Sequence, residues 1–230
     1  MKVMLTDFSG SYGEQGFTQW LQERGKGDLQ YVDFRSLEGT SCLCGAREDI
    51  ISGLPERLPR LRWIDSGDYH YMTHLLALRE TRPFHLLLLD HHPDNQASAF
   101  GAEVLSCGSW VRTMLEENPL LQGVLTVGPE GAPSAIPEAW IEARRGERVY
   151  LSLDKDIMGP QWARTGWTQG THSLPQVLEM IALLLENTDV AAIDICGELP
   201  CGKGARGEDA RINFETNIRL YEFFTNYNIN

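Results

Sequence analysis

The chain has 230 residues, a formal net charge of −12, and ordinary fractions of hydrophobic (42%) and charged (23%) residues. This length suits one well-buried domain over residues 1–230, and the acidic balance argues against nucleic acid or an anionic membrane as a partner. Five cysteines, an odd number, fit a reducing compartment better than a disulfide framework. Because the first residues resemble a strand rather than a signal peptide, and no apolar run is long enough to span a membrane, we expect a cytoplasmic protein.

Strands and helices are predicted to alternate along the chain. Apolar runs predict strands at residues 3–6, 29–34, 61–65, 84–90, 124–127, 149–154 and 190–196. Apolar periodicity and turn residues predict helices around residues 17–21, 48–54, 72–80, 109–117, 137–144, 174–186 and 208–227. Several of the strands are continuous apolar runs, which is typical of strands buried on both faces. We therefore expect an α/β domain with a mostly parallel sheet that helices cover on both sides.

The most informative stretch is the leucine run Leu86–Leu89, which leads directly into Asp90, His92 and Asp94. Successive strand residues point to opposite faces, so these three side chains could converge while His91 turns away. Two carboxylates and an imidazole suit manganese, zinc or iron, and burying them is costly unless a cation compensates their charge. The simpler interpretation is a polar loop whose aspartates cap the next helix.

Two further polar clusters follow predicted strands. Asp154 and Asp156 end one strand and share a face, whereas Lys155 between them points the other way. Residues 67–70, Gly-Asp-Tyr-His, follow another strand and add the imidazole of His70. A lone Asp-x-Asp is weak evidence, because helix caps produce it often. In parallel sheets, however, ligands bind at the carboxyl ends of the strands, where these clusters gather.

Taken in order, Gly-Asp-x-His, Asp-x-His-x-Asp and Ser-x-Asp-x-Asp resemble the arginase/agmatinase (ureohydrolase) family, within the arginase–deacetylase superfamily. Residues 107–112, Cys-Gly-Ser-Trp-Val-Arg, resemble the agmatinase His-Gly-Thr-x-x-Arg segment, and residues 194–200 resemble its Asp-Ile-x-Glu-x-x-Pro segment. The resemblance extends from about residue 61 to residue 219. It implies a three-layer α/β/α sandwich and two divalent ions, with Mn²⁺ expected first and Zn²⁺ or Fe²⁺ as alternatives. The implied metal ligands are His70, Asp90, His92, Asp94, Asp154 and Asp156.

The implied chemistry is attack by metal-bound hydroxide on a carbon–nitrogen bond of an amidino or amide small molecule. The chain departs from the family pattern around that chemistry: Cys107 replaces a proton-shuttling histidine, and Gly159 replaces the last acid of its motif. Gly197 stands where an acid would contact a guanidinium group, and Glu198 follows it. Expected catalytic residues are Glu198, Cys107 and Asp94. Expected substrate-binding residues are Asn95, Lys203 and Arg206.

Three other interpretations remain open on the sequence. A mononuclear zinc enzyme similar to the deacetylases would use Asp90, His92 and Asp154. A non-catalytic protein of the same fold would bind metal for stability or regulation. The glycine-rich loop at residues 202–207 could instead hold an anion or a nucleotide on backbone amides. The family resemblance also makes a homo-oligomer possible.

Overall fold

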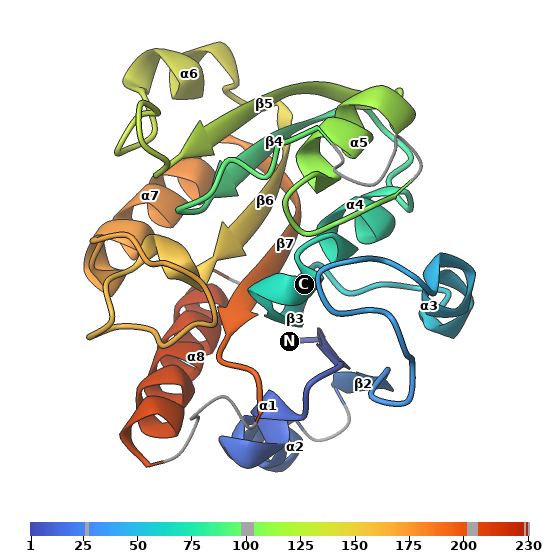
Figure 1. The fold of residues 1–230 in the computed structure, drawn as a ribbon. Helices are drawn as coiled ribbons and strands as arrows, with labels where there is room; N and C mark the ends of the chain where they lie inside the picture. Colours follow the sequence, from blue (N-terminus) through green and yellow to red (C-terminus); the bar gives the residue numbers. More distant parts are fainter. Residues whose placement is uncertain (26–27, 98–103, 202–206, 228, 230) are drawn as a thin grey trace.

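The computed structural model describes residues 1–25, 28–97, 104–201, 207–227 and 229. Within them, seven strands form one sheet in the order β2-β1-β3-β7-β6-β4-β5 (Figure 1). All six neighbouring pairs of strands are parallel, as the apolar runs predicted. The strands are β1 (Val3–Asp7), β2 (Leu29–Asp33), β3 (Leu61–Ser66), β4 (Phe84–Leu89), β5 (Leu121–Val127), β6 (Arg148–Asp154) and β7 (Asp189–Glu198).

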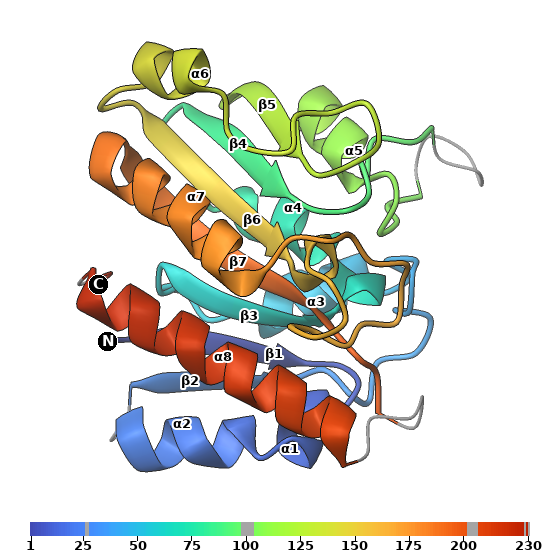
Figure 2. The ribbon, with the colours of Figure 1, turned by 90° about the vertical axis from the view of Figure 1, so that its left-hand side faces the viewer.

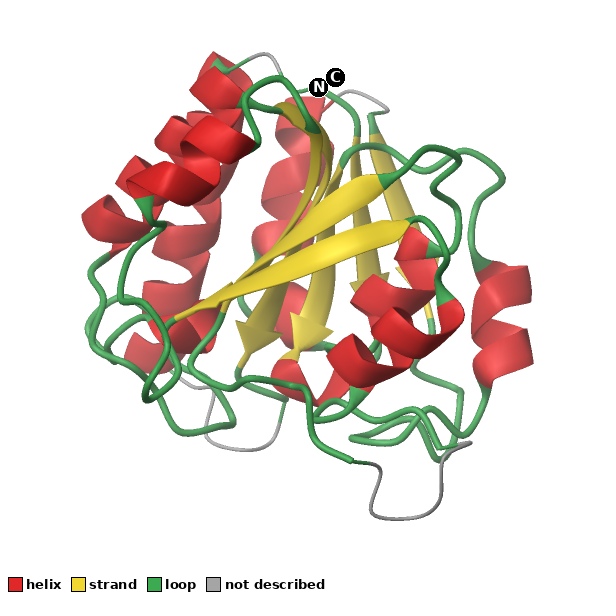
Figure 3. Cartoon of the chain, turned by 90° about the horizontal axis from the view of Figure 1, so that it is seen from above, coloured by secondary structure: helices red, strands yellow, loops and turns green. Residues whose placement is uncertain are grey.

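Helices cover both faces of the sheet and make the three layers that the resemblance implies (Figures 2 and 3). The α-helices are α1 (Ser11–Glu14), α2 (Phe17–Gly25), α3 (Arg47–Gly53), α4 (Met72–Ala77), α5 (Trp110–Glu117), α6 (Glu138–Ala143), α7 (Leu174–Asn187) and α8 (Glu208–Asn226). Two short 3₁₀ helices, η1 (Gly67–Tyr69) and η2 (Lys155–Ile157), directly follow β3 and β6.

The sheet separates two hydrophobic cores, and alternate residues of one strand belong to different cores. Leu87 and Leu89 of β4 pack in the core beneath α1, α2, α6, α7 and α8. Leu86 and Leu88 pack in the core beneath α3, α4 and α5. A strand between two apolar layers must be apolar at every position, which is why β4 has a continuous leucine run.

Element boundaries differ from the prediction where tertiary pairing adds partners. β5 begins at Leu121, three residues earlier than predicted, because Leu121 pairs with Phe84 on β4. The expected glycine-serine loop after β1 contains the short helix α1. The residue before this helix, Gly10, has a left-handed backbone conformation (φ 81°). Among the described residues, no helix is both long enough and apolar enough to cross a membrane.

Candidate metal centre

His70 faces three carboxylates at the carboxyl edge of the sheet. It directly follows η1, so the chain leaving β3 places its ring beside Asp90 and Asp94, which follow β4, and Asp154, which ends β6. His70 Nδ1 lies 3.0 Å from Asp94 Oδ2, 3.3 Å from Asp90 Oδ2 and 3.4 Å from Asp154 Oδ2. All four side chains are almost fully buried. Nitrogen and oxygen donors this close, with the imidazole at the centre, form the first of two ligand groups.

His92 is the centre of the second group. Its Nδ1 lies 2.8 Å from Asp156 Oδ2 and 3.6 Å from Asp90 Oδ1. Asp90 therefore belongs to both groups: one of its oxygens faces His70 and the other faces His92. A carboxylate shared in this way can contact cations in both ligand groups.

The outer nitrogens of both imidazoles are held by hydroxyl groups. His70 Nε2 lies 2.8 Å from Ser152 Oγ, and His92 Nε2 lies 2.9 Å from Thr168 Oγ1. Such contacts orient a ligand imidazole and leave its other nitrogen facing the ion. Ser152 and Thr168 were not predicted as site residues. Ser152 stands inside the quoted Ser-x-Asp-x-Asp motif, whereas no sequence signal marks Thr168.

Asp94 is oriented by Trp110, a residue of the Cys-Gly-Ser-Trp-Val-Arg segment that was not predicted as a site residue. Trp110 Nε1 donates a hydrogen bond to Asp94 Oδ2 at 2.6 Å. The two rings of Trp110 and His70 also pack, with their centroids 4.8 Å apart. Trp110 begins α5, so this helix fixes both the carboxylate and the imidazole beside it.

The polar residues converge through turns, which corrects the expected strand alternation. β4 ends at Leu89, and Asp94 has a positive φ of 44°, so residues 90–94 are not part of a strand. The His92 backbone N–H donates to Asp90 Oδ1 at 2.6 Å and closes this turn. At the other cluster, the Asp156 N–H donates to Asp154 Oδ1 at 2.9 Å and starts η2. Asp90, His92 and Asp94 nevertheless line one cavity, as expected.

The crowding of buried carboxylates shifts their pKa values in opposite directions. Burial raises the pKa of Asp154 to about 7, and burial together with neighbouring carboxylates raises those of Asp94 and Asp156. Burial opposes ionisation of Asp90 too, but its interactions with the imidazoles of His70 and His92 hold its pKa below the usual range. Hydrogen bonding to Asp156 and Asp90 raises the pKa of His92 to about 10. The cluster therefore needs positive charge, which protons or bound cations can supply.

The residues present fit a divalent metal. Asp90 Oδ2 is buried and accepts no hydrogen bond within the described residues, so it is an unsatisfied oxygen aimed at the first ligand group. The cavity measures about 50 Å³, which suits ions, water and the reacting end of a small molecule. Its lining combines four aspartates and His92 with Gly67, Gln96, Cys107, Gly108 and Trp167. An oxygen-rich donor set with imidazoles matches Mn²⁺, Fe²⁺ or Zn²⁺ better than thiolate-bound ions.

One buried thiol lies beside this cluster. Cys196 on β7 forms a further group with His70 and Asp154. Burial raises the pKa of Cys196 well above its usual value, and its Sγ donates to the Ser66 carbonyl at 3.1 Å. Without a bound ion, Cys196 is therefore a protonated thiol, whereas a coordinated cation would favour its thiolate.

The expected catalytic and substrate-binding residues lie in different environments. Cys107 lines the cavity, but burial raises its pKa, so the thiol keeps its proton at neutral pH. Glu198 is fully buried and hydrogen-bonds to interior side chains, and it is not one of the cavity-lining residues within the described part of the chain. Asn95 is exposed beside Asp94, and its neighbour Gln96 lines the cavity. Lys203 and Arg206 lie outside the described residues.

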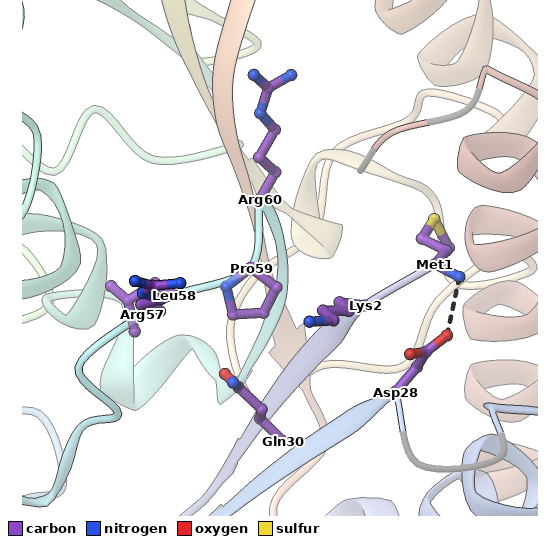
Figure 4. Close-up of a pocket in the computed structure, with 8 residues that line it drawn as sticks. All are labelled: Met1, Lys2, Asp28, Gln30, Arg57, Leu58, Pro59 and Arg60. Carbon is purple, nitrogen blue, oxygen red and sulfur yellow. Dashed lines mark hydrogen bonds and ion pairs between the residues drawn. The ribbon is translucent and has the colours of Figure 1, made fainter.

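A larger pocket of about 500 Å³ opens near the amino ends of β1, β2 and β3 (Figure 4). Lys2, Arg57 and Arg60 are among its lining residues, and the Met1 amine pairs with Asp28 at 3.1 Å. Its described lining contains no histidine or cysteine and a single carboxylate. Volume alone therefore does not identify a reactive site, because the potential metal ligands line the smaller cavity.

Comparisons with known proteins concern the fold of the chain. No family model matches the chain. An uncharacterized protein of Thermotoga maritima is 27% identical over 214 residues, covering 85% of this chain and 79% of that protein. Proclavaminate amidino hydrolase from Streptomyces clavuligerus superposes with a TM-score of 0.70 at 16% identity, over 99% of this chain and 91% of the other.

Two Bacillus subtilis structures are also similar. Arginase has a TM-score of 0.65 at 13% identity, over 97% of this chain and 98% of that chain. Formimidoylglutamase has a TM-score of 0.64 at 15% identity, over 97% and 86% of the two chains. At these identities the comparison is one of folds, and it confirms the fold that the sequence motifs implied.

Proposed function

We propose that this chain, which has the fold of the arginase/ureohydrolase family, is a divalent-metal-dependent hydrolase of a carbon–nitrogen bond in an amidino or amide small molecule. The observation that carries the proposal is the position of Asp90, whose two carboxylate oxygens face His70 and His92 respectively. Two cations held by this set would activate water and polarise the substrate at neutral pH. We expect Mn²⁺ first, with Zn²⁺ or Fe²⁺ as alternatives.

Each of the two ligand groups would hold one ion. His70, Asp94 and Asp154 would hold one ion and His92 and Asp156 the other, with Asp90 common to both. With ions bound, the Nδ1 of each imidazole would face the cluster while its Nε2 stays beside the hydroxyl of Ser152 or Thr168. The two hydroxyl groups thus hold the orientation of both rings.

The cavity and the similar structures support a small substrate with a reactive carbon–nitrogen bond. A cavity of about 50 Å³ admits only the reacting end of a molecule. Trp167 forms part of its wall and is held there by a hydrogen bond from its Nε1 to Asp68 Oδ1 at 3.0 Å. Amidino hydrolysis appears in the name of the similar Streptomyces clavuligerus structure, which favours amidino compounds as the first class to screen.

The test is elemental analysis of protein purified without added metal or chelator. The wild-type chain is compared with an Asp90→Ala/Asp156→Ala variant and with a control, Asp49→Ala/Glu116→Ala, which removes two exposed carboxylates. We expect about two divalent ions per chain in the wild type and the control, and none in the ligand variant. Release of urea or ammonia from a panel of amidines and amides then identifies the reaction.

Other outcomes separate the alternatives. One zinc per chain would favour the mononuclear deacetylase-like interpretation. Two ions without turnover on a broad panel would favour a non-catalytic metal-binding protein. Absence of metal even after Mn²⁺ is offered in excess would refute the hydrolase proposal.

A further inference from the structure

A charged side chain lies in the interior directly behind the candidate metal centre. Lys155 stands between Asp154 and Asp156 at the start of η2, and its side chain is 0% exposed. Its ammonium group pairs with Glu198, which is also 0% exposed, and contacts Asn217 Oδ1 at 3.2 Å. Neither charge touches solvent, so each depends on the other for compensation.

Glu198 is fully engaged by this interior network. Besides the Lys155 ammonium, its Oε1 accepts a hydrogen bond from Asn217 Nδ2 at 2.8 Å, and its Oε2 accepts one from Gln15 Nε2 at 2.7 Å. Asn217 Oδ1 also accepts the indole N–H of Trp63 at 3.1 Å. The network therefore joins α8, β3, the end of β7 and the turn after β6, and it reaches the segment between α1 and α2.

The backbone around Lys155 has little freedom to move. Gly197 on β7 has a φ of 92°, and a Cβ built there would lie 2.3 Å from Asp154 Oδ1 and 2.7 Å from the Lys155 backbone nitrogen. The peptide of β7 is thus packed directly against the turn. The Asp156 carbonyl is held from another direction by the Gly170 N–H at 2.7 Å.

We propose that Lys155 is a positioning residue for the metal centre: its buried pairing with Glu198 and Asn217 anchors the turn that carries Asp154 and Asp156. The inference rests on the proposed function, because it assigns Lys155 an effect on ligands. The long side chain runs from the turn to Glu198 and Asn217 in the interior, so these contacts hold the turn in the observed conformation. The two flanking carboxylates are thereby directed to His70 and His92.

The test is a Mn²⁺ titration of the full chain, monitored by electron paramagnetic resonance. The wild type is compared with two variants. Lys155→Met removes the ammonium group, keeps a long apolar side chain and leaves the buried Glu198 carboxylate without its cation. Lys155→Met/Glu198→Gln also removes that carboxylate charge, so the double variant avoids the cost of an unpaired buried charge. We expect both variants to bind Mn²⁺ about 10- to 100-fold more weakly than the wild type, which is the usual effect of removing support behind a ligand. We also expect them to lose the spectrum of two coupled ions.

A stability control separates positioning from general loosening. Leu184→Ala creates a cavity beneath α7 in the core, and Leu184 makes none of the hydrogen bonds of the Lys155–Glu198 network. It should lower the unfolding midpoint and leave Mn²⁺ affinity and the coupled spectrum unchanged. Wild-type affinity in both Lys155 variants, or an equal loss of affinity in Leu184→Ala, would overturn the inference while leaving the proposed function intact. A wild-type chain that binds no Mn²⁺ would refute the proposed function and the inference with it.

Discussion

Replacing Gly197 by alanine should destabilise the protein through two separate effects. Gly197 has a φ of 92°, a conformation that L-residues rarely adopt, so any side chain is strained there. The added Cβ would also lie 2.3 Å from Asp154 Oδ1 and 2.7 Å from the Lys155 nitrogen, so a metal-ligand candidate or the backbone must move. Because both neighbours are buried, neither can move freely toward solvent.

The size of the effect follows from these two terms. An unfavourable backbone conformation costs about 1–3 kcal/mol. An overpacked interior contact adds about 1–3 kcal/mol. Gly197→Ala should therefore lower the free energy of unfolding by about 2–6 kcal/mol, a large share of the ~5–15 kcal/mol typical of a folded domain.

Gly131 provides the matched control. It also has a positive φ, 82°, but an added Cβ would meet no atom within 4 Å. Gly131→Ala should therefore show only the backbone term, about 1–3 kcal/mol. Urea denaturation of both variants, with unchanged m values, measures the difference. Equal destabilisation of the two variants would refute the steric reasoning about the β7 contact with Asp154.

The remaining predictions concern the metal centre and one buried histidine. Trp110→Phe keeps an aromatic ring but removes the N–H that donates to Asp94. Thr168→Val removes the hydroxyl that contacts His92 Nε2. Each substitution should weaken Mn²⁺ binding by about 10-fold or more in a titration. Dialysis of the metal-loaded protein against a chelator should lower the free energy of unfolding, by about 2.7 kcal/mol where the ion had been at 100 times its Kd. Burial lowers the pKa of His74, so the unfolded chain binds more protons than the folded chain below the ordinary histidine pKa of about 6.5. The contribution of His74 to stability should fall as the pH drops below that value, by at most about 1.4 kcal/mol per pH unit, whereas the raised pKa values of Asp94, Asp154 and Asp156 act in the opposite direction. In urea denaturation, lowering the pH from 7 to 5 should therefore be less unfavourable to His74→Gln than to the wild type.

Several features were predictable because they are local in the sequence. The leucine run of β4 and the similar apolar runs identify the inner strands, since a strand buried on both faces must be apolar at successive positions. The edge strands β2 and β5 are only partly buried and carry polar residues within them. The polar residues that follow these runs lie together, because parallel strands bring their carboxyl ends to one edge. Residue type and order were therefore enough to predict the fold and to collect His70, Asp90 and Asp154 at one site.

Only the tertiary structure decided how these side chains are oriented and supported. Thr168 contacts His92 across a separation of 76 residues, and Lys155 pairs with Glu198 across 43, so no local pattern contains both partners. Glu198 was predicted to act in catalysis or substrate contact, but its carboxylate is hydrogen-bonded inside the protein. The periodicity of apolar residues predicts which face of a helix or strand is buried. The partner of a buried charge depends instead on strand order and on side-chain packing between distant segments.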